Sequence, residues 1–270
     1  MKVLIMIRFG LHDFLNAQPL MVPLVRQQKE LGVKIVPGVP SVLAEKLKTR
    51  ELDLAMIPTI EYLKKADGYR LLPEVAIASR DKVGTVLLVS QVPLDKIKTL
   101  ALDDRSRTSV ALLKILFADR FGQDVKFTPS PPDPEAMLKN HDAALIIGDQ
   151  AFSLPKLPTE TKVYDLSQEW FLKTRKTFVH AVVAVREGVV LSQEFCDKIQ
   201  RAKQEGLLEI ADIADRYVAD SGLDLHTSED YLRNKIIYDL GRQELEGMTL
   251  FRDKCFEQGM ISQKHAIRFV

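Results

Sequence analysis

The stretch TLALDDRSRTSVALLKILFADRF, residues 99–121, contains a complete strand–turn–helix unit. Thr99–Leu102 is a short apolar run that predicts a strand, and Thr108–Phe121 has the apolar spacing of a helix. The polar residues between them, Asp103–Arg107, predict the turn. Because strands and helices that alternate in this way are typical of α/β proteins, the stretch indicates that fold class.

The alternation continues on both sides of this unit. Further strands are expected at Val3–Ile7, Val33–Val36, Leu52–Ile57, Glu74–Ser79, Thr85–Ser90, Val125–Thr128, Ala143–Ile147 and Phe178–Val185. Further helices are expected at Ala17–Glu30, Ile60–Ala66, Glu135–Lys139, Gln193–Ala219 with a break at Gly206, Ser228–Gly241 and Gln243–Gln258. The pattern predicts largely parallel sheets followed by a helical C-terminal part.

Two lobes, if present, have to be joined by strand-like crossings, because no flexible linker is visible in the composition. Val86–Val92 and Thr177–Ala181 are the candidate crossings. We therefore expect a discontinuous first lobe, residues 1–88 plus 180–270, and a second lobe, residues 89–179. A cleft between lobes is where a small ligand usually binds.

Composition excludes several classes of protein. The 270 residues are 46% hydrophobic and 28% charged, which is the balance of an ordinary globular protein. The 38 lysines and arginines against 37 acidic residues give a net charge of +1, so a nucleic-acid partner is not expected. Apolar runs are too short for a membrane span or a signal peptide, which predicts a cytoplasmic protein.

Cofactor signatures are missing as well. Cys196 and Cys255 form no zinc or disulfide pattern and predict two buried thiols, and the histidines show no metal-ligand spacing. The sequence contains no glycine-rich phosphate loop, dinucleotide fingerprint or nucleophile elbow. We therefore expect neither a metal nor a cofactor.

The start of the helix after Asp103–Arg107 is a candidate anion site. The free N–H groups and dipole of a helix start favour an anion, and Ser106, Thr108 and Ser109 add hydroxyl donors. Arginines in the turn raise the local positive potential. Ordinary capping by Ser106 or Thr108 explains the same residues without a ligand.

Other candidates lie at strand ends, where ligands bind in open α/β sheets. Asn16 precedes a predicted helix and Asp149 follows a buried strand, although capping or turn formation also accounts for them. His180 in an apolar strand is either a packed core histidine or a base, and Trp170 is a core or rim aromatic.

Several stretches together resemble one enzyme family, the chorismate dehydratases of the futalosine route to menaquinone. The matching stretches occur in family order: Gly10–Leu20, Leu52–Tyr62, Leu71–Pro73, Ile77–Ser79, Ser106–Leu116, Ala143–Ala151 and Asp165–Arg186. The resemblance implies a two-lobed fold like that of type II periplasmic solute-binding proteins. It also implies chorismate in the cleft and loss of water without a cofactor.

The resemblance also implies roles for particular residues. Asn16 and Thr85 would act at the reacting centre, while Ser106, Arg107, Thr108, Ser109 and Asp149 would bind the substrate. With no obvious glutamate or histidine base in these motifs, a substrate-assisted elimination by the enolpyruvyl carboxylate is expected.

This chain departs from the family pattern at two places. Thr85 stands where serine is usual, and Thr174–Thr177 and His180 replace a segment that usually contains glycine and proline and an apolar residue. A non-catalytic cytoplasmic binding protein or sensor for an aromatic carboxylate is therefore the alternative. The sibling dihydroxynaphthoate synthase is disfavoured because its Ser-x-Cys-Pro-Asn-Asp pattern is absent. A monomer or a homodimer is expected.

Overall fold

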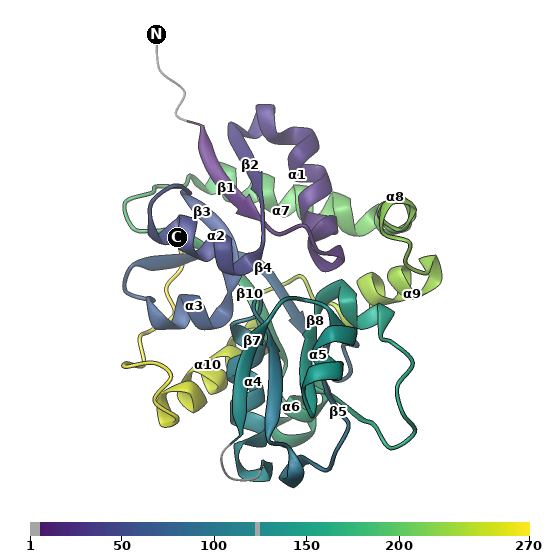
Figure 1. The fold of residues 1–270 in the computed structure, drawn as a ribbon. Coiled ribbons are helices and arrows are strands. Elements are labelled where there is room, and N and C mark those ends of the chain that lie inside the picture. The colour runs from purple at the N-terminus through teal and green to yellow at the C-terminus, as the bar shows by residue number, and fades with distance from the viewer. Residues whose placement is uncertain (1–5, 122–124) are drawn as a thin grey trace.

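The first lobe is built on a mixed five-stranded sheet at the top of Figure 1. This computed structural model describes residues 6–121 and 125–270. The strand order is β2 (Val33–Pro37), β1 (Ile7–Leu11), β3 (Leu54–Pro58), β10 (Phe178–Arg186) and β4 (Tyr69–Ser79). Its helices are α1 (Gln18–Leu31), α2 (Pro40–Lys48), α3 (Thr59–Lys64), α7 (Gln193–Leu208), α8 (Ile210–Ser221), α9 (Leu225–Asp230) and α10 (Arg242–Glu257).

The second lobe repeats the arrangement with another mixed five-stranded sheet. Its strand order is β7 (Lys126–Ser130), β6 (Thr99–Asp103), β8 (Ala143–Ile147), β5 (Val86–Ser90) and β9 (Lys162–Asp165). Its helices are α4 (Thr108–Phe117), α5 (Pro134–Asn140) and α6 (Leu166–Thr174). The α/β class with two lobes is as predicted.

The strand that follows each crossing inserts antiparallel into its sheet. β5 lies between β8 and β9, and β10 lies between β3 and β4, all with antiparallel pairing. The expectation of largely parallel sheets therefore holds only for three strands on one side of each sheet, β2-β1-β3 and β7-β6-β8. A strand that returns from the other lobe enters from the opposite end, which explains its reversed direction.

The chain passes between the sheets after Ser79 at the end of β4 and before Phe178 at the start of β10. Asp165 fixes the outward crossing, because its carboxylate accepts hydrogen bonds from the N–H groups of Val83 (2.9 Å) and Gly84 (2.6 Å). The lobe boundaries predicted at residues 88/89 and 179/180 stay a prediction.

Several predicted elements are shifted in the structure. The predicted strand Val3–Ile7 falls mostly on residues 1–5, which lie outside the described residues, and β1 begins at Ile7. The predicted helix Thr108–Phe121 is wrong at its end, because α4 stops at Phe117 and a 3-10 turn follows.

The C-terminal helices differ from the prediction for reasons of packing. The break expected at Gly206 lies at Glu209, between α7 and α8. Gly206 is instead a contact point with α1, since a Cβ atom there would lie 1.7 Å from the carbonyl oxygen of Pro19. The helix predicted for Ser228–Gly241 is replaced by α9, a π-helical turn at Tyr231–Lys235 and an extended segment. That segment pairs with β4, with Ile237 and Ala78 exchanging backbone hydrogen bonds of 2.8 and 2.9 Å.

Buried aromatic side chains join α6, β10 and α10. Trp170 is 1% exposed and packs edge-on against Phe178 and Phe251, so it is a core residue. Cys196 and Cys255 are both buried free thiols, as predicted. No helix in the described residues is long and apolar enough to cross a bilayer.

Candidate functional site

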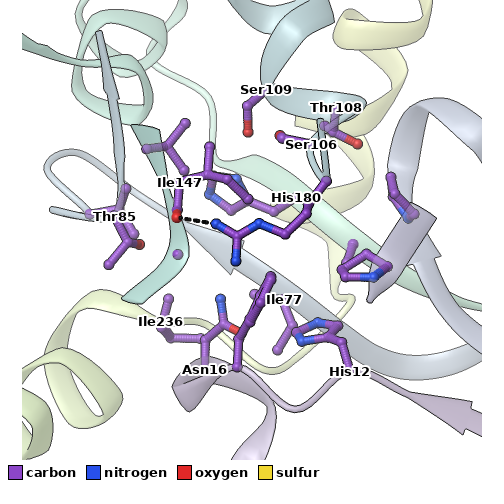
Figure 2. A pocket seen from close by; sticks show the side chains of 18 of the residues that line it. His12, Asn16, Ile77, Thr85, Ser106, Thr108, Ser109, Ile147, His180 and Ile236 are labelled. Atoms are coloured by element: carbon purple, nitrogen blue, oxygen red, sulfur yellow. Dashed lines mark hydrogen bonds between the residues drawn. The ribbon is translucent and has the colours of Figure 1, made fainter. Parts of the chain in front are cut away.

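A pocket lies between the two sheets, at the carboxyl ends of strands from both lobes (Figure 2). The space between its walls is about 590 Å³, part of which is open to solvent. The first lobe contributes His12, Phe14, Asn16, Pro40, Pro58, Ile77, His180, Ala181, Tyr231 and Ile236. The second lobe and the crossing contribute Val83, Thr85, Val86, Arg105, Ser106, Arg107, Thr108, Ser109, Ile147 and Gly148. All predicted site residues except Asp149 therefore line one pocket.

Asn16, Thr85 and Tyr231 form a hydrogen-bonded group in this pocket. The Asn16 amide Nδ2 donates to the Tyr231 hydroxyl (3.2 Å), and that hydroxyl lies 2.9 Å from Thr85 Oγ1. Burial raises the pKa of Tyr231, so the phenol keeps its proton. The other amide atom, Asn16 Oδ1, is buried without a hydrogen-bond partner. The group thus offers an oriented acceptor to a ligand.

The predicted anion site at the start of α4 faces the same pocket. Ser106, Thr108 and Ser109 all line it, and Thr108 and Ser109 are buried. Thr108 Oγ1 accepts a hydrogen bond from the Ile60 N–H (3.3 Å) across the lobes, which leaves its hydroxyl proton to donate. The first N–H groups of a helix have no partner within it, so this end of α4 is rich in donors.

Both arginines of the turn are already paired with carboxylates. Arg105 forms a two-pronged ion pair with Asp103 (2.6 and 2.9 Å) and lies over the Phe14 ring, 5.3 Å from its centroid. The dashed line in Figure 2 marks a longer contact from Arg105 to the Ile147 carbonyl, 3.5 Å.

Arg107 crosses between the lobes to Glu45 (3.1 Å) and Glu61 (3.0 Å). Although Arg107 lines the pocket, its charge is thus shared with two carboxylates of the first lobe.

Two neutral histidines, His12 and His180, also line the pocket and are labelled in Figure 2. Burial lowers the pKa of His12 and of His180 to about 4. His12 Nδ1 is buried without a hydrogen-bond partner, whereas His180 Nε2 lies 2.7 Å from the Ser79 hydroxyl. His180 is therefore a pocket residue as well as a neighbour of the core aromatic Phe178.

Asp149 lies just beyond the pocket and joins the lobes. Its carboxylate accepts a hydrogen bond from the Tyr217 hydroxyl (2.5 Å) and a long one from the Leu15 N–H (3.3 Å). Burial raises the pKa of Asp149. The structure thus brings Asp149 to a contact with the first lobe, next to the pocket residue Gly148.

The lining residues favour an anionic ligand. Among the described residues that line the pocket there is no aspartate, glutamate or lysine, while hydroxyls, imidazoles and a helix start supply donors. No group of three or more potential ligands among the described residues could hold a metal ion. The arrangement can therefore bind a small molecule with carboxylates and orient a hydroxyl at Asn16.

Sequence reasoning missed Tyr231, His12 and the contacts of Asp149. Tyr231 lies in a segment predicted to be an ordinary helix, and its partner Asn16 is 215 residues away. His12 sits two residues after Gly10 at the end of β1, so its strand-end position was the available signal.

Comparison with known proteins agrees with this geometry. A chorismate dehydratase of Thermus thermophilus is 29% identical over 237 residues, which cover 82% of this chain and 86% of that protein. A chorismate dehydratase of Campylobacter jejuni is 27% identical over 252 residues, covering 92% of this chain and 96% of the relative.

Solved structures share the fold. A protein of Archaeoglobus fulgidus superposes with a TM-score of 0.74 at 20% identity, covering 94% of this chain and 98% of that one. The alkanesulfonate-binding protein of Xanthomonas axonopodis, bound to MOPS, gives a TM-score of 0.68 at 17% identity. The match covers 96% of this chain and 94% of that one. The predicted fold, that of periplasmic solute-binding proteins, is confirmed.

A family model described as menaquinone biosynthesis matches residues 7–257. That match spans both sheets and the whole pocket. The chain therefore belongs to the menaquinone biosynthesis family.

Proposed function

We propose that this protein is a chorismate dehydratase, a hydro-lyase that converts chorismate into 3-[(1-carboxyvinyl)oxy]benzoate and water. The observation that carries the proposal is the gathering of Asn16, Thr85 and the Ser106–Ser109 turn in one pocket whose described lining has no carboxylate. These residues come from separate segments of the chain. The named activity of the relatives from Thermus and Campylobacter supports the same substrate.

The proposed reaction is a 1,2-elimination. The C–H bond at the ring carbon bearing the enolpyruvyl ether breaks, and its electron pair forms the new ring double bond. The C–O bond to the neighbouring hydroxyl breaks, and the leaving hydroxide combines with the abstracted proton to give water. The ring becomes aromatic, which supplies the driving force without an oxidant or a reductant.

The substrate's own enolpyruvyl carboxylate is the proposed base. The described lining of the pocket contributes no carboxylate that could take the proton. The protein then acts chiefly by positioning, an effect worth up to ~7–11 kcal/mol in favourable cases.

Asn16 is proposed to orient the leaving hydroxyl. Its unpartnered Oδ1 accepts a hydrogen bond from that hydroxyl, while Nδ2 is held by the Tyr231 hydroxyl, which is itself hydrogen-bonded to Thr85. The hydroxyls and N–H groups at the start of α4 hold a carboxylate of the substrate. Arg107 and Asp149 contribute through the contacts that hold the lobes together over the ligand.

The test is incubation of the purified protein with chorismate, followed by ultraviolet absorbance and mass analysis. We expect loss of one water, about 18 mass units, without an added cofactor. Asn16→Ala should lower kcat at least about 100-fold, the size seen when one oriented polar group is removed from a reacting centre. Gln18→Ala is the matched control, because that amide donates to the Asp13 carbonyl outside the pocket (2.8 Å) and its loss should leave kcat within about threefold.

Binding of chorismate without product would contradict the enzyme and support the binding protein or sensor instead. Thr85, where the resemblance to the family implies a serine, would then be the first residue to change, by Thr85→Ser. The proposal also places the reaction in the cytoplasm, which localisation of the tagged protein tests. The predicted monomeric or homodimeric state stays a prediction.

A further inference from the structure

His180 is the one described histidine whose ring is held on one edge by a chain of buried hydroxyls while the ring itself lines the pocket. Its Nε2 lies 2.7 Å from Ser79 Oγ at the end of β4, and Ser79 Oγ lies 2.6 Å from Ser167 Oγ at the start of α6. Ser79 and Ser167 are 0% and 1% exposed. The hydroxyl chain therefore ends at the pocket through His180.

The imidazole is also fixed by packing. Its ring meets the Phe178 ring edge-on, with centroids 4.9 Å apart, and Phe178 is packed in turn against Trp170 and Phe251. A side chain locked by both packing and a hydrogen bond is preorganised for contact with a ligand.

The second ring nitrogen is available to a ligand. His180 Nδ1 makes no hydrogen bond within residues 6–121 and 125–270, and it is not among the buried atoms that lack a partner. Because the ring lines the pocket, Nδ1 is the ring nitrogen left to contact a ligand there. Burial lowers the pKa of this histidine to about 4, so the ring is uncharged at neutral pH and carries one N–H.

The direction of the hydroxyl chain decides which nitrogen carries that proton. When Ser167 donates to Ser79 and Ser79 donates to Nε2, the proton is on Nδ1 and points to the ligand. The reverse direction makes Nδ1 an acceptor. A carboxylate has acceptors only, so a bound dianion selects the first arrangement.

We propose that His180 binds the substrate directly, donating a hydrogen bond from Nδ1 to a carboxylate, with Ser79 and Ser167 as positioning residues. The inference rests on the proposed function for the identity of the dianion, chorismate. It adds to the start of α4 a second, uncharged contact for a carboxylate, supplied by the opposite lobe.

Two matched substitutions separate the two nitrogens. His180→Asn keeps a donor near the position of Nδ1 and loses the reach to Ser79, whereas His180→Gln keeps the reach to Ser79 and loses the pocket donor. We expect His180→Gln to raise the KM for chorismate about 10- to 100-fold with little change in kcat, because it removes a hydrogen bond to a charged group. His180→Asn keeps the pocket donor, so its KM should rise much less than that of His180→Gln.

Ser79→Ala tests the positioning role. It leaves Nδ1 in place but frees the ring, so KM should rise by a smaller factor than in His180→Gln. Thermal unfolding of each variant identifies loss of folding, which would lower the apparent kcat and leave KM unchanged. An equal effect of His180→Gln and His180→Asn, or no effect of either on KM, overturns the proposal while the dehydratase stands.

Binding of chorismate by calorimetry separates this proposal from the proposed function. If the wild type binds chorismate without forming product, and His180→Gln but not His180→Asn weakens binding, the histidine contact stands and the dehydratase fails. If the wild type neither binds nor converts chorismate, both fail.

Discussion

Acidification should destabilise the folded protein through its two buried histidines, His12 and His180. Burial lowers the pKa of each to about 4, against an ordinary value of 6.5. Between these two pH values the unfolded chain binds protons that the folded protein excludes, so the free energy of unfolding decreases as the pH falls. At pH 4.5 the loss relative to pH 7 is about 2 kcal/mol for each histidine.

Three aspartates change the free energy of unfolding in other ways as the pH falls. Asp149 and Asp165 have pKa values raised by burial, so they take up protons more readily in the folded state and oppose the loss. Asp53 has its pKa lowered to about 2, chiefly by hydrogen bonds from Arg8 that outweigh its own desolvation, and its stabilisation is lost only below pH 3.8. Asp149 and Asp165 therefore offset part of the loss caused by the two histidines.

Urea unfolding followed by Trp170 fluorescence at pH 7 and pH 4.5 measures the effect. Glutamine does not titrate, so His12→Gln should reduce the difference between the two free energies by about 2 kcal/mol. A loss of stability that is the same at both pH values cancels in this difference, so each variant serves as its own control. A difference within about 0.5 kcal/mol of the wild-type value would refute the burial of a neutral His12.

Three further changes test the fold and the pocket. Gly206→Ala should cost about 1–3 kcal/mol or more in urea unfolding, because its Cβ meets the Pro19 carbonyl at 1.7 Å, whereas Gly68→Ala has its nearest atom at 3.6 Å and should cost far less. Tyr231→Phe should lower kcat about 10-fold or more with about 1 kcal/mol of stability lost, because Asn16 and Thr85 lose their shared partner; wild-type turnover would exclude the hydroxyl from the site. Asp53→Asn should lose about 2 kcal/mol at pH 7, and a loss just as large at pH 2 would rule out the ion pairs with Arg8 and Arg186 as its cause.

The local units of the fold were predictable because their signals are local. The apolar run at residues 99–102, the polar turn and the following apolar helix lie within one stretch, and β6 and α4 form there. The hydroxyls of Ser106, Thr108 and Ser109 face the pocket because a helix starting after a strand places them at the sheet edge.

Features that depend on distant contacts were not predictable. Gly206 was interpreted as a helix break, although its role is to let α7 approach the Pro19 backbone of α1. Residues 236–241 have an apolar pattern compatible with a helix, but pairing with Ala78 of β4 makes them extended. That extension follows the π-helical turn that holds Tyr231 in the pocket, so the error in secondary structure and the missed site residue share one cause.

The charged side chains and the neutral polar groups of the cleft make different kinds of contact. Arg107 pairs with Glu45 and Glu61, and Asp149 contacts Tyr217, so the charged side chains between the lobes are occupied by protein partners. Pocket residues also carry polar atoms without a protein partner, among them Asn16 Oδ1, His12 Nδ1 and His180 Nδ1, and these atoms are uncharged.

A ligand therefore need not displace an ion pair to bind, because the ion pairs hold the lobes together while neutral groups recognise the ligand. Neutral donors also keep one carboxylate of the substrate free of a strong counter-ion, which preserves its basicity. A substrate-assisted elimination needs that property, since an arginine clamped to the same carboxylate would lower its pKa and weaken the base.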